Sequence, residues 1–236
     1  MQKLFQSIVF IFICVTVLSC DKDNYDAPST ALTGRLVYNG EAIGVERNQV
    51  PFELYQYGFG KVAPIRATFA QDGSYSAMLF NGDYKLIIPN GQGPFIWNKT
   101  ASGAPDSLSI SLNGNQTLDL QVMPYYMIRN AQFSAGSGKV TATFKAEKVI
   151  TDANAKDIER VELYINKTQF VSRGGEDQIK MTEMTGANIA DPNNITLSVD
   201  VPSITPTQNY VFARVGLKIA GIEDRLYSQV QKIQLQ

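Results

Sequence analysis

The sequence predicts an all-β protein built from two β-sandwiches in tandem. After residue 27 no long segment repeats its apolar residues every 3.6 positions, as an amphipathic helix would. Short runs instead alternate between apolar and polar residues, and turns rich in glycine and asparagine separate them. A length of 236 residues suits one or two domains. We therefore expect one sandwich over residues 31–123 and a second over residues 124–236.

The first half holds enough strand candidates for a small sandwich, which needs about seven. Asp72-Gly73, Asn81-Gly82 and Asn113-Gly114 separate alternating runs, and glycine supplies the positive φ that tight hairpin turns need. We expect hairpins across all three dipeptides. The expected strands are 32–38, 50–56, 65–70, 74–80, 83–89, 107–112 and 117–122.

The second half continues the pattern beyond a boundary near Met123-Pro124-Tyr125, where proline cannot donate to a sheet ladder. In the run 139–149 the even-numbered positions from Val140 to Ala146 are apolar and the positions between them are polar, which predicts a half-buried strand. Residues 170–172 could form a short extra strand, and we interpret 173–194 mainly as a loop excursion. The other expected strands are 127–133, 159–165, 195–201, 210–220 and 226–235.

The N-terminus predicts an export signal over residues 1–19. Lys3 is the only charge before Cys20, and residues 8–18 are apolar apart from Thr16. A basic start and a short apolar core are typical of a secretory signal peptide, and the run is too short to span a bilayer. A buried N-terminal strand or helix is the alternative.

The end of this segment predicts a lipid anchor. Residues 17–20, Val-Leu-Ser-Cys, resemble the bacterial lipobox, in which the cysteine becomes the acylated first residue. Two or more acyl chains give stable anchoring, so Cys20 would attach the protein to the outer membrane. Residues 20–30 would then form an acidic tether, similar to those of surface-exported lipoproteins in Bacteroidota. The acidic residues 21–26 lack the glycine and the distal glutamate of a calcium loop.

Composition excludes several function classes. Removing residues 1–19 takes one lysine from 21 basic residues, which leaves 20 against 22 acidic ones and a net charge of −2. Such a chain has no basic field for nucleic acid. It contains no histidine, and acylation would leave no free thiol, so triad catalysis and typical zinc sites are excluded. We expect no metal, no cofactor and no enzyme activity, although a pair of carboxylates that cleaves glycosidic bonds stays open.

Three stretches carry a family resemblance: "NYDAPSTALTGRLVYNGEAI" (24–43), "FAQDGSYSAMLFNGDYKLIIPNGQGPF" (69–95) and "LDLQVMPYY" (118–126). They resemble an uncharacterised two-domain lipoprotein family of Bacteroidota, domain of unknown function 3823. The resemblance implies a role beside the outer-membrane transporters and glycan-capture lipoproteins of polysaccharide utilisation. The first domain is also similar to carboxypeptidase-regulatory or transthyretin-like domains, and the second resembles an immunoglobulin or fibronectin III sandwich. The family has no established catalytic residues.

One loop is the best candidate for binding a glycan, because sugar rings pack on exposed aromatic side chains beside polar groups. Residues 90–100 contain Trp97, the only tryptophan, together with Phe95 and with Gln92 and Asn98 as polar partners. In the alternative interpretation, Phe95 and Trp97 plug the core of the first domain.

Other stretches suggest further contacts. Tyr57 and Phe59 form a second aromatic candidate for the glycan site, whereas Tyr125-Tyr126 is expected to pack between the domains. Ser107 follows an aspartate, a short pattern used for O-glycosylation in Bacteroidota, or a plain turn. The loop 173–178 could contact a partner or simply be solvated.

These observations favour an accessory surface lipoprotein that binds a glycan or docks to a transporter and glycan-capture complex. The alternative is a structural or protein-interaction module without a small ligand.

Overall fold

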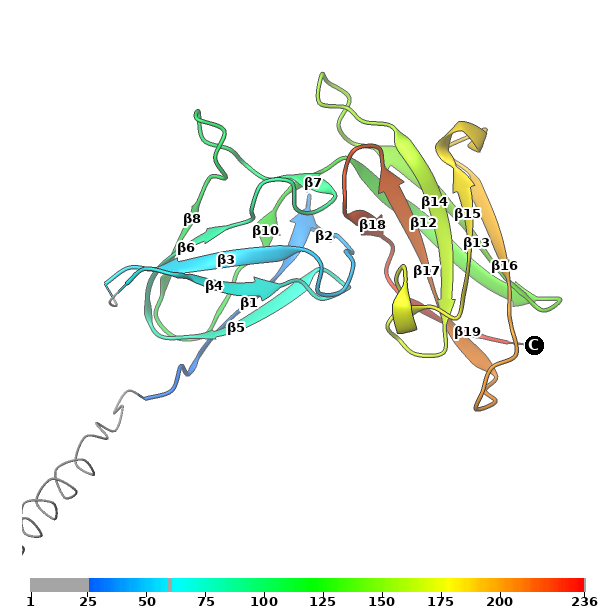
Figure 1. Cartoon of the computed structure of the whole chain (residues 1–236), viewed down its shortest axis with the longest axis horizontal. Coiled ribbons are helices and arrows are strands. Elements are labelled where there is room, and N and C mark those ends of the chain that lie inside the picture. Colours follow the sequence, from blue (N-terminus) through cyan, green and yellow to red (C-terminus); the bar gives the residue numbers. More distant parts are fainter. Residues whose placement is uncertain (1–25, 59–60, 236) are drawn as a thin grey trace, which may run out of the picture.

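The computed structural model describes residues 26–58 and 61–235, and it confirms the all-β prediction. Two β-sandwich bodies lie side by side along the long axis of the molecule, the first in blue to green and the second in green to red (Figure 1). The predicted signal peptide, Cys20, most of the acidic tether and Phe59 fall outside the described residues. Within the described ranges, no helix has both the length and the apolar character needed to cross a membrane.

The first domain is a sandwich of two sheets. In one sheet β1 pairs with β2, β5, β9 and β10, and in the other the order is β4-β3-β6-β8, while β7 and β11 form a separate ribbon. The strands are β1 (Thr30–Tyr38), β2 (Glu41–Ala42), β3 (Pro51–Gln56), β4 (Pro64–Thr68), β5 (Ser74–Leu79), β6 (Gly82–Ile87), β7 (Phe95–Ile96), β8 (Leu108–Leu112), β9 (Gln116–Thr117), β10 (Leu120–Gln121) and β11 (Met123–Pro124).

The predicted hairpins across Asp72-Gly73, Asn81-Gly82 and Asn113-Gly114 are wrong, although the chain changes direction at each of them. At Asn81-Gly82 it passes from β5 in one sheet to β6 in the other. At Asp72-Gly73 the chain leaves β4 in one sheet and enters β5 in the other, and at Asn113-Gly114 it leaves β8 for β9. Gly73 and Gly114 do have φ near +81° and +91°, so they reverse the chain as expected. The reversal crosses the sandwich because both flanking strands bury one face against the same core. A different dipeptide, Asn39-Gly40, closes a two-residue hairpin between β1 and β2.

An aromatic cluster fills the centre of this first sandwich. The rings of Phe52 and Phe69 lie 4.9 Å apart, and Tyr75 meets Phe52 edge-on at 5.1 Å. Aromatic pairs in such tilted and edge-on arrangements add to the stability that burial alone provides. The Tyr75 hydroxyl donates to the Leu118 carbonyl, which joins the core to the segment between β9 and β10.

The second domain packs the sheet β12-β13-β16 against a sheet of order β15-β14-β17, with β18 and β19 both paired to β17. The even-numbered residues from Val140 to Ala146 are buried, which confirms the predicted alternation. The excursion predicted for 173–194 contains a strand, β15, and residues 170–172 form none. The strands are β12 (Tyr126–Gly136), β13 (Lys139–Lys148), β14 (Ile158–Asn166), β15 (Lys180–Thr185), β16 (Ile195–Asp200), β17 (Tyr210–Ile219), β18 (Arg225–Tyr227) and β19 (Gln231–Gln234).

A buried arginine joins the two domains. Arg214 of β17 is fully buried, and its guanidinium donates to the carbonyls of Ser228 (2.7 Å) and Val171 (3.2 Å). Its remaining nitrogen donates to the carbonyl of Gln71, which belongs to the first domain. Beside it, the Tyr227 backbone N–H donates to the Gly44 carbonyl, again across the interface.

The loop 173–178 contacts the first domain of the same chain. Asp177 forms an ion pair with Arg47 at 3.1 Å, and the Arg47 guanidinium also lies 4.5 Å from the centre of the Phe170 ring. The interface therefore combines directional polar contacts with a cation–π contact.

We expect Arg214→Ala to lower the free energy of unfolding by about 3 kcal/mol or more, because it leaves a cavity and three carbonyls without their donor. Arg214→Lys keeps the charge but cannot reproduce the planar fork, so a smaller fall is expected. Urea unfolding of the purified protein measures both values.

Arg66→Ala is the matched control, since the Arg66 side chain is 71% exposed and forms an exposed ion pair with Glu53. That variant should change the free energy of unfolding by less than about 1 kcal/mol. Equal losses for Arg214→Ala and Arg66→Ala would contradict the structural role of Arg214.

Candidate functional site

A hollow in the first domain lies beside Trp97. Its volume is about 270 Å³. The half-buried indole of Trp97 lines it together with two leucines, Leu108 of β8 and Leu118. Exposed polar residues make up the rest of the lining: Asn98, Asp106, Ser107, Asp119 and Gln121. The hollow thus combines an apolar part with several groups that can accept or donate hydrogen bonds.

The Trp97 loop, defined as residues 89–98, is fixed by backbone pairing. Phe95 and Ile96 form β7 and pair with Pro124 and Met123 of β11. The indole N–H of Trp97 donates to the Asp106 carbonyl at 2.8 Å, which holds the ring in one orientation. The Asp106 backbone N–H in turn donates to the Asn98 carbonyl at 2.8 Å. The segment at Asp106 is therefore held against the segment that carries Trp97.

Phe95 is only 5% exposed, so the prediction that it contacts a glycan is wrong. Phe95 belongs to the buried core, as in the alternative interpretation, and the half-buried Trp97 also packs against that core. The Phe95 ring in addition covers Gly93. A Cβ added at Gly93 would lie 2.3 Å from the Phe95 ring, and Gly93 has φ of +80°. Glycine is therefore required at this position both by the backbone and by the close approach of the ring.

The structure brings Trp97, Asn98 and Ser107 together and leaves Gln92 outside the hollow. Gln92 is half-buried, and its backbone N–H donates to the Pro89 carbonyl. Sequence reasoning missed Leu118, Asp119 and Gln121. They come from the segment around β9 and β10, which only the sandwich packing carries to the tryptophan.

The two carboxylates of the hollow each accept a hydrogen bond from a backbone N–H group, but from different segments. Asp119 accepts the backbone N–H of Arg35 at 2.9 Å, which ties it to β1. Asp106 accepts the backbone N–H of Ser107 at 2.8 Å. Each carboxylate has lone pairs beyond those used, so both can accept further hydrogen bonds from a ligand.

Tyr57 lies at a different place, on the outer face of the sheet β4-β3-β6-β8. Its side chain is 59% exposed and lines a hollow of about 410 Å³ with Asp83, Lys85 and Ser109. The Lys85 ammonium already donates to the Ser109 hydroxyl. Trp97 does not line this hollow, so the two aromatic candidates belong to separate places on the first domain.

The second domain contains a hollow of about 620 Å³ next to Tyr126. Its ionic groups are mostly satisfied. Lys148 pairs with Asp157 at 3.2 Å and lies 5.8 Å from the Tyr126 ring centre, and Glu147 accepts from Arg129. Tyr126 and its neighbour Tyr125 are buried at the junction, where the Tyr126 hydroxyl donates to the Lys156 carbonyl.

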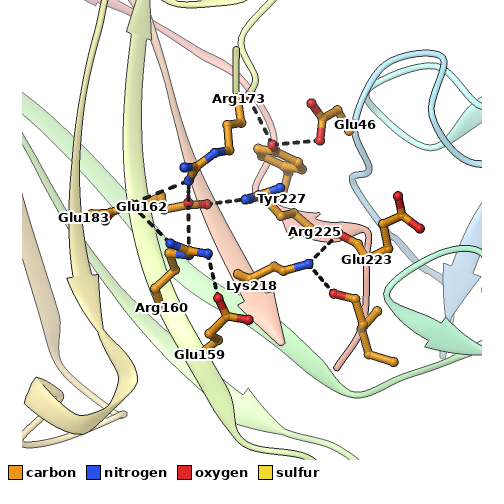
Figure 2. A network of polar contacts seen from close by, with 11 residues as sticks. Glu46, Glu159, Arg160, Glu162, Arg173, Glu183, Lys218, Glu223, Arg225 and Tyr227 are labelled. Carbon is orange, nitrogen blue, oxygen red and sulfur yellow. Dashed lines mark hydrogen bonds and ion pairs between the residues drawn. The ribbon is translucent and has the colours of Figure 1, made fainter. Parts of the chain in front are cut away.

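A charged network occupies the outer face of the sheet β15-β14-β17 (Figure 2). The fully buried Glu162 accepts from Arg173 and, at 2.8 Å, from Arg225, and Arg160 lies 3.7 Å away. Glu159 and Glu183 also pair with these arginines, so positive and negative charges balance. The network therefore organises the sheet through the pairing of three arginines with three glutamates. Over the described part of the chain, no three side chains of His, Cys, Asp or Glu converge as metal ligands.

The fold and this site define a two-domain β-sandwich protein with an aromatic hollow on its first domain. Two family models match, "Protein of unknown function (DUF3823) N-terminal domain" over residues 30–123 and "Domain of unknown function (DUF3823_C)" over residues 126–232. The chain belongs to the DUF3823 family.

Solved structures agree with this assignment. A DUF3823 family protein from Bacteroides ovatus ATCC 8483 is 32% identical with a TM-score of 0.74, and one from Parabacteroides merdae ATCC 43184 is 31% identical with a TM-score of 0.75. The match covers 89% of this chain and 100% of each relative.

A third structure, a "putative carbohydrate binding protein" from Bacteroides uniformis ATCC 8492, is 18% identical with a TM-score of 0.66 over 89% of this chain and 100% of that one. At that identity it shows the shared fold. No curated protein matches the chain.

We expect Gly93→Ala to destabilise the protein more than Gly91→Ala. Both glycines have φ near +80°, so both substitutions carry the same backbone strain, of about 1–2 kcal/mol. Only the Gly93 methyl would meet the Phe95 ring, which should add about 1–3 kcal/mol. Urea unfolding of the two variants measures the difference, and equal losses would show that Phe95 can move away without cost.

Proposed function

We propose that this protein is a non-catalytic glycan-binding lipoprotein of the outer-membrane surface that assists a polysaccharide-uptake complex. The observation that carries the proposal is the Trp97 hollow, in which an indole and two leucines lie among exposed carboxylate, amide and hydroxyl groups. The C–H face of a sugar ring packs on an aromatic ring, while its hydroxyls need polar partners that fix its orientation.

The volume of the hollow indicates that it would bind one sugar unit of a longer polysaccharide. Drug-sized ligands occupy pockets of about 300–1,000 Å³, and 270 Å³ lies below that range. Hydroxyl groups of a sugar would donate to Asp106 and Asp119 and exchange hydrogen bonds with Asn98 or Gln121. The name of the related Bacteroides uniformis structure supports a carbohydrate ligand.

The N-terminal pattern supports the location. The lipobox-like residues 17–20 and the acidic residues after Cys20 are typical of lipid-anchored surface proteins. The family resemblance adds the expected partners, a transporter and a glycan-capture protein.

A docking module without a small ligand is the second candidate function. Exposed apolar side chains on two edge strands favour it: Met78 of β5 is 56% exposed, and Ile65 of β4 is also exposed. Each strand pairs with a single neighbour, β3 for β4 and β1 for β5. Such edges can receive another chain.

Affinity electrophoresis against a panel of polysaccharides tests the glycan proposal. We expect at least one polysaccharide to retard the protein, and Trp97→Ala to weaken binding about tenfold or more, which is 1.4 kcal/mol. Tyr57→Ala is the matched aromatic control and should bind normally. If Trp97→Ala unfolds, the same electrophoresis is carried out with Asn98→Ala and Gln121→Ala, which change exposed residues of the hollow.

Two results would contradict this proposal. Unchanged retardation of Trp97→Ala would place the site elsewhere. No retardation by any polysaccharide would refute glycan binding and favour docking.

Lipid attachment has its own test. With a metabolically incorporated palmitate analogue, the wild-type chain should be labelled and sediment with membranes, because thioether acylation needs the Cys20 sulfur. Cys20→Ser should lose the label, whereas Cys14→Ser, the other cysteine of the chain, should keep it. Label on Cys20→Ser would refute the anchor.

A further inference from the structure

We propose that Asp224, a residue of the second domain, is a positioning residue for the Trp97 site in the first domain. The inference rests on the proposed function, since it assigns a role in glycan binding. It states that the second domain holds the Trp97 loop in the shape that forms the hollow.

A single buried contact joins the two. The Asp224 carboxylate accepts the backbone N–H of Gly93 at 2.6 Å, and the two residues are 131 positions apart in the chain. Asp224 is only 9% exposed. A carboxylate bound to an N–H group forms a stronger hydrogen bond than a neutral acceptor does, and exclusion of water strengthens it further.

The turn that carries Asp224 is fixed on both sides. Figure 2 shows the contacts of its neighbours Glu223 and Arg225. The Lys218 ammonium donates to the carbonyl of Ile222 and, at 2.6 Å, to that of Glu223. On the other side, Arg225 donates to the buried Glu162 at 2.8 Å. Contacts of Lys218 and of the charged network therefore hold the turn that carries Asp224 in place.

On the first domain, the contact reaches Trp97 through four residues. The Phe95 ring lies against Gly93, and the Pro94 carbonyl accepts the Tyr125 N–H at 3.2 Å. Ile96 then pairs with β11, and Trp97 follows directly. A displacement of Gly93 would have to move the Phe95 plug, and with it the strand that ends at the tryptophan.

The test uses Trp97 as its own reporter, because it is the only tryptophan of the chain. The variants are Asp224→Ala and Asp224→Asn, and the control is Glu223→Gln, which removes the same charge from the exposed neighbouring residue. The full chain is purified in a detergent without a sugar headgroup. Emission wavelength and acrylamide quenching are measured without ligand, and affinity for the retarding polysaccharide is measured alongside.

We expect Asp224→Ala to shift the emission to longer wavelength and to raise the quenching constant about twofold, because the loop opens locally. Its glycan affinity should fall about tenfold, since a loosened site loses its preorganisation. Asp224→Asn should show smaller changes in the same direction, and Glu223→Gln none. A merely structural role for Asp224 would lower the unfolding temperature and leave the native-state emission unchanged.

The proposal is overturned if folded Asp224→Ala matches Glu223→Gln in emission and quenching, or if its glycan affinity equals that of the wild type. If Asp224→Ala does not fold, Asp224→Asn decides by the same criteria. If the wild-type protein binds no polysaccharide, the proposed function fails, and the emission and quenching data alone still decide whether Asp224 positions Trp97.

Discussion

The buried guanidinium of Arg214 is the interaction on which the arrangement of the two domains depends. The guanidinium donates hydrogen bonds to carbonyl groups of both domains, and it lies 4.3 Å from the centre of the Tyr227 ring. Burial lowers the pKa of Arg214 to about 10, so the group is still a cation at neutral pH. Separation of the domains would remove the Gln71 carbonyl, the acceptor that the first domain supplies, from the guanidinium. The side chain therefore favours one relative orientation.

The space around Arg214 leaves little freedom to the first domain. A Cβ added at Gly44 would lie 2.5 Å from the Tyr227 carbonyl oxygen and 2.9 Å from an Arg214 nitrogen. The chain of the first domain can approach the second only because residue 44 is glycine. Polar contacts depend on direction more than apolar packing does, so an interface of this kind specifies an orientation as well as an affinity.

The alternation of apolar and polar residues was enough to predict most strands, but it could not assign them to sheets. A glycine turn such as Asp72-Gly73 reverses the chain equally well within a sheet and between sheets. β15 was missed because it is a half-exposed edge strand. Its apolar and polar residues therefore alternate only weakly in the sequence. Trp97 could be singled out as a unique aromatic in a glycine-rich loop. Asp119 and Gln121 could not, since they meet it only through the packing of β1 against β9 and β10.

The two domains have unequal parts in the proposed site, and this follows from how the Trp97 loop is held. Residues of the first domain line the whole hollow, yet Gly93 at the base of its loop is bound by a carboxylate of the second. A loop held from both domains loses little conformational entropy when a ligand binds, and that reduces the cost of binding. Arg214 keeps the domains in register, and the network around Glu162 fixes the turn that presents Asp224. In the proposal made above, the second domain serves as a scaffold that shapes a site on the first, and the two domains function as one unit.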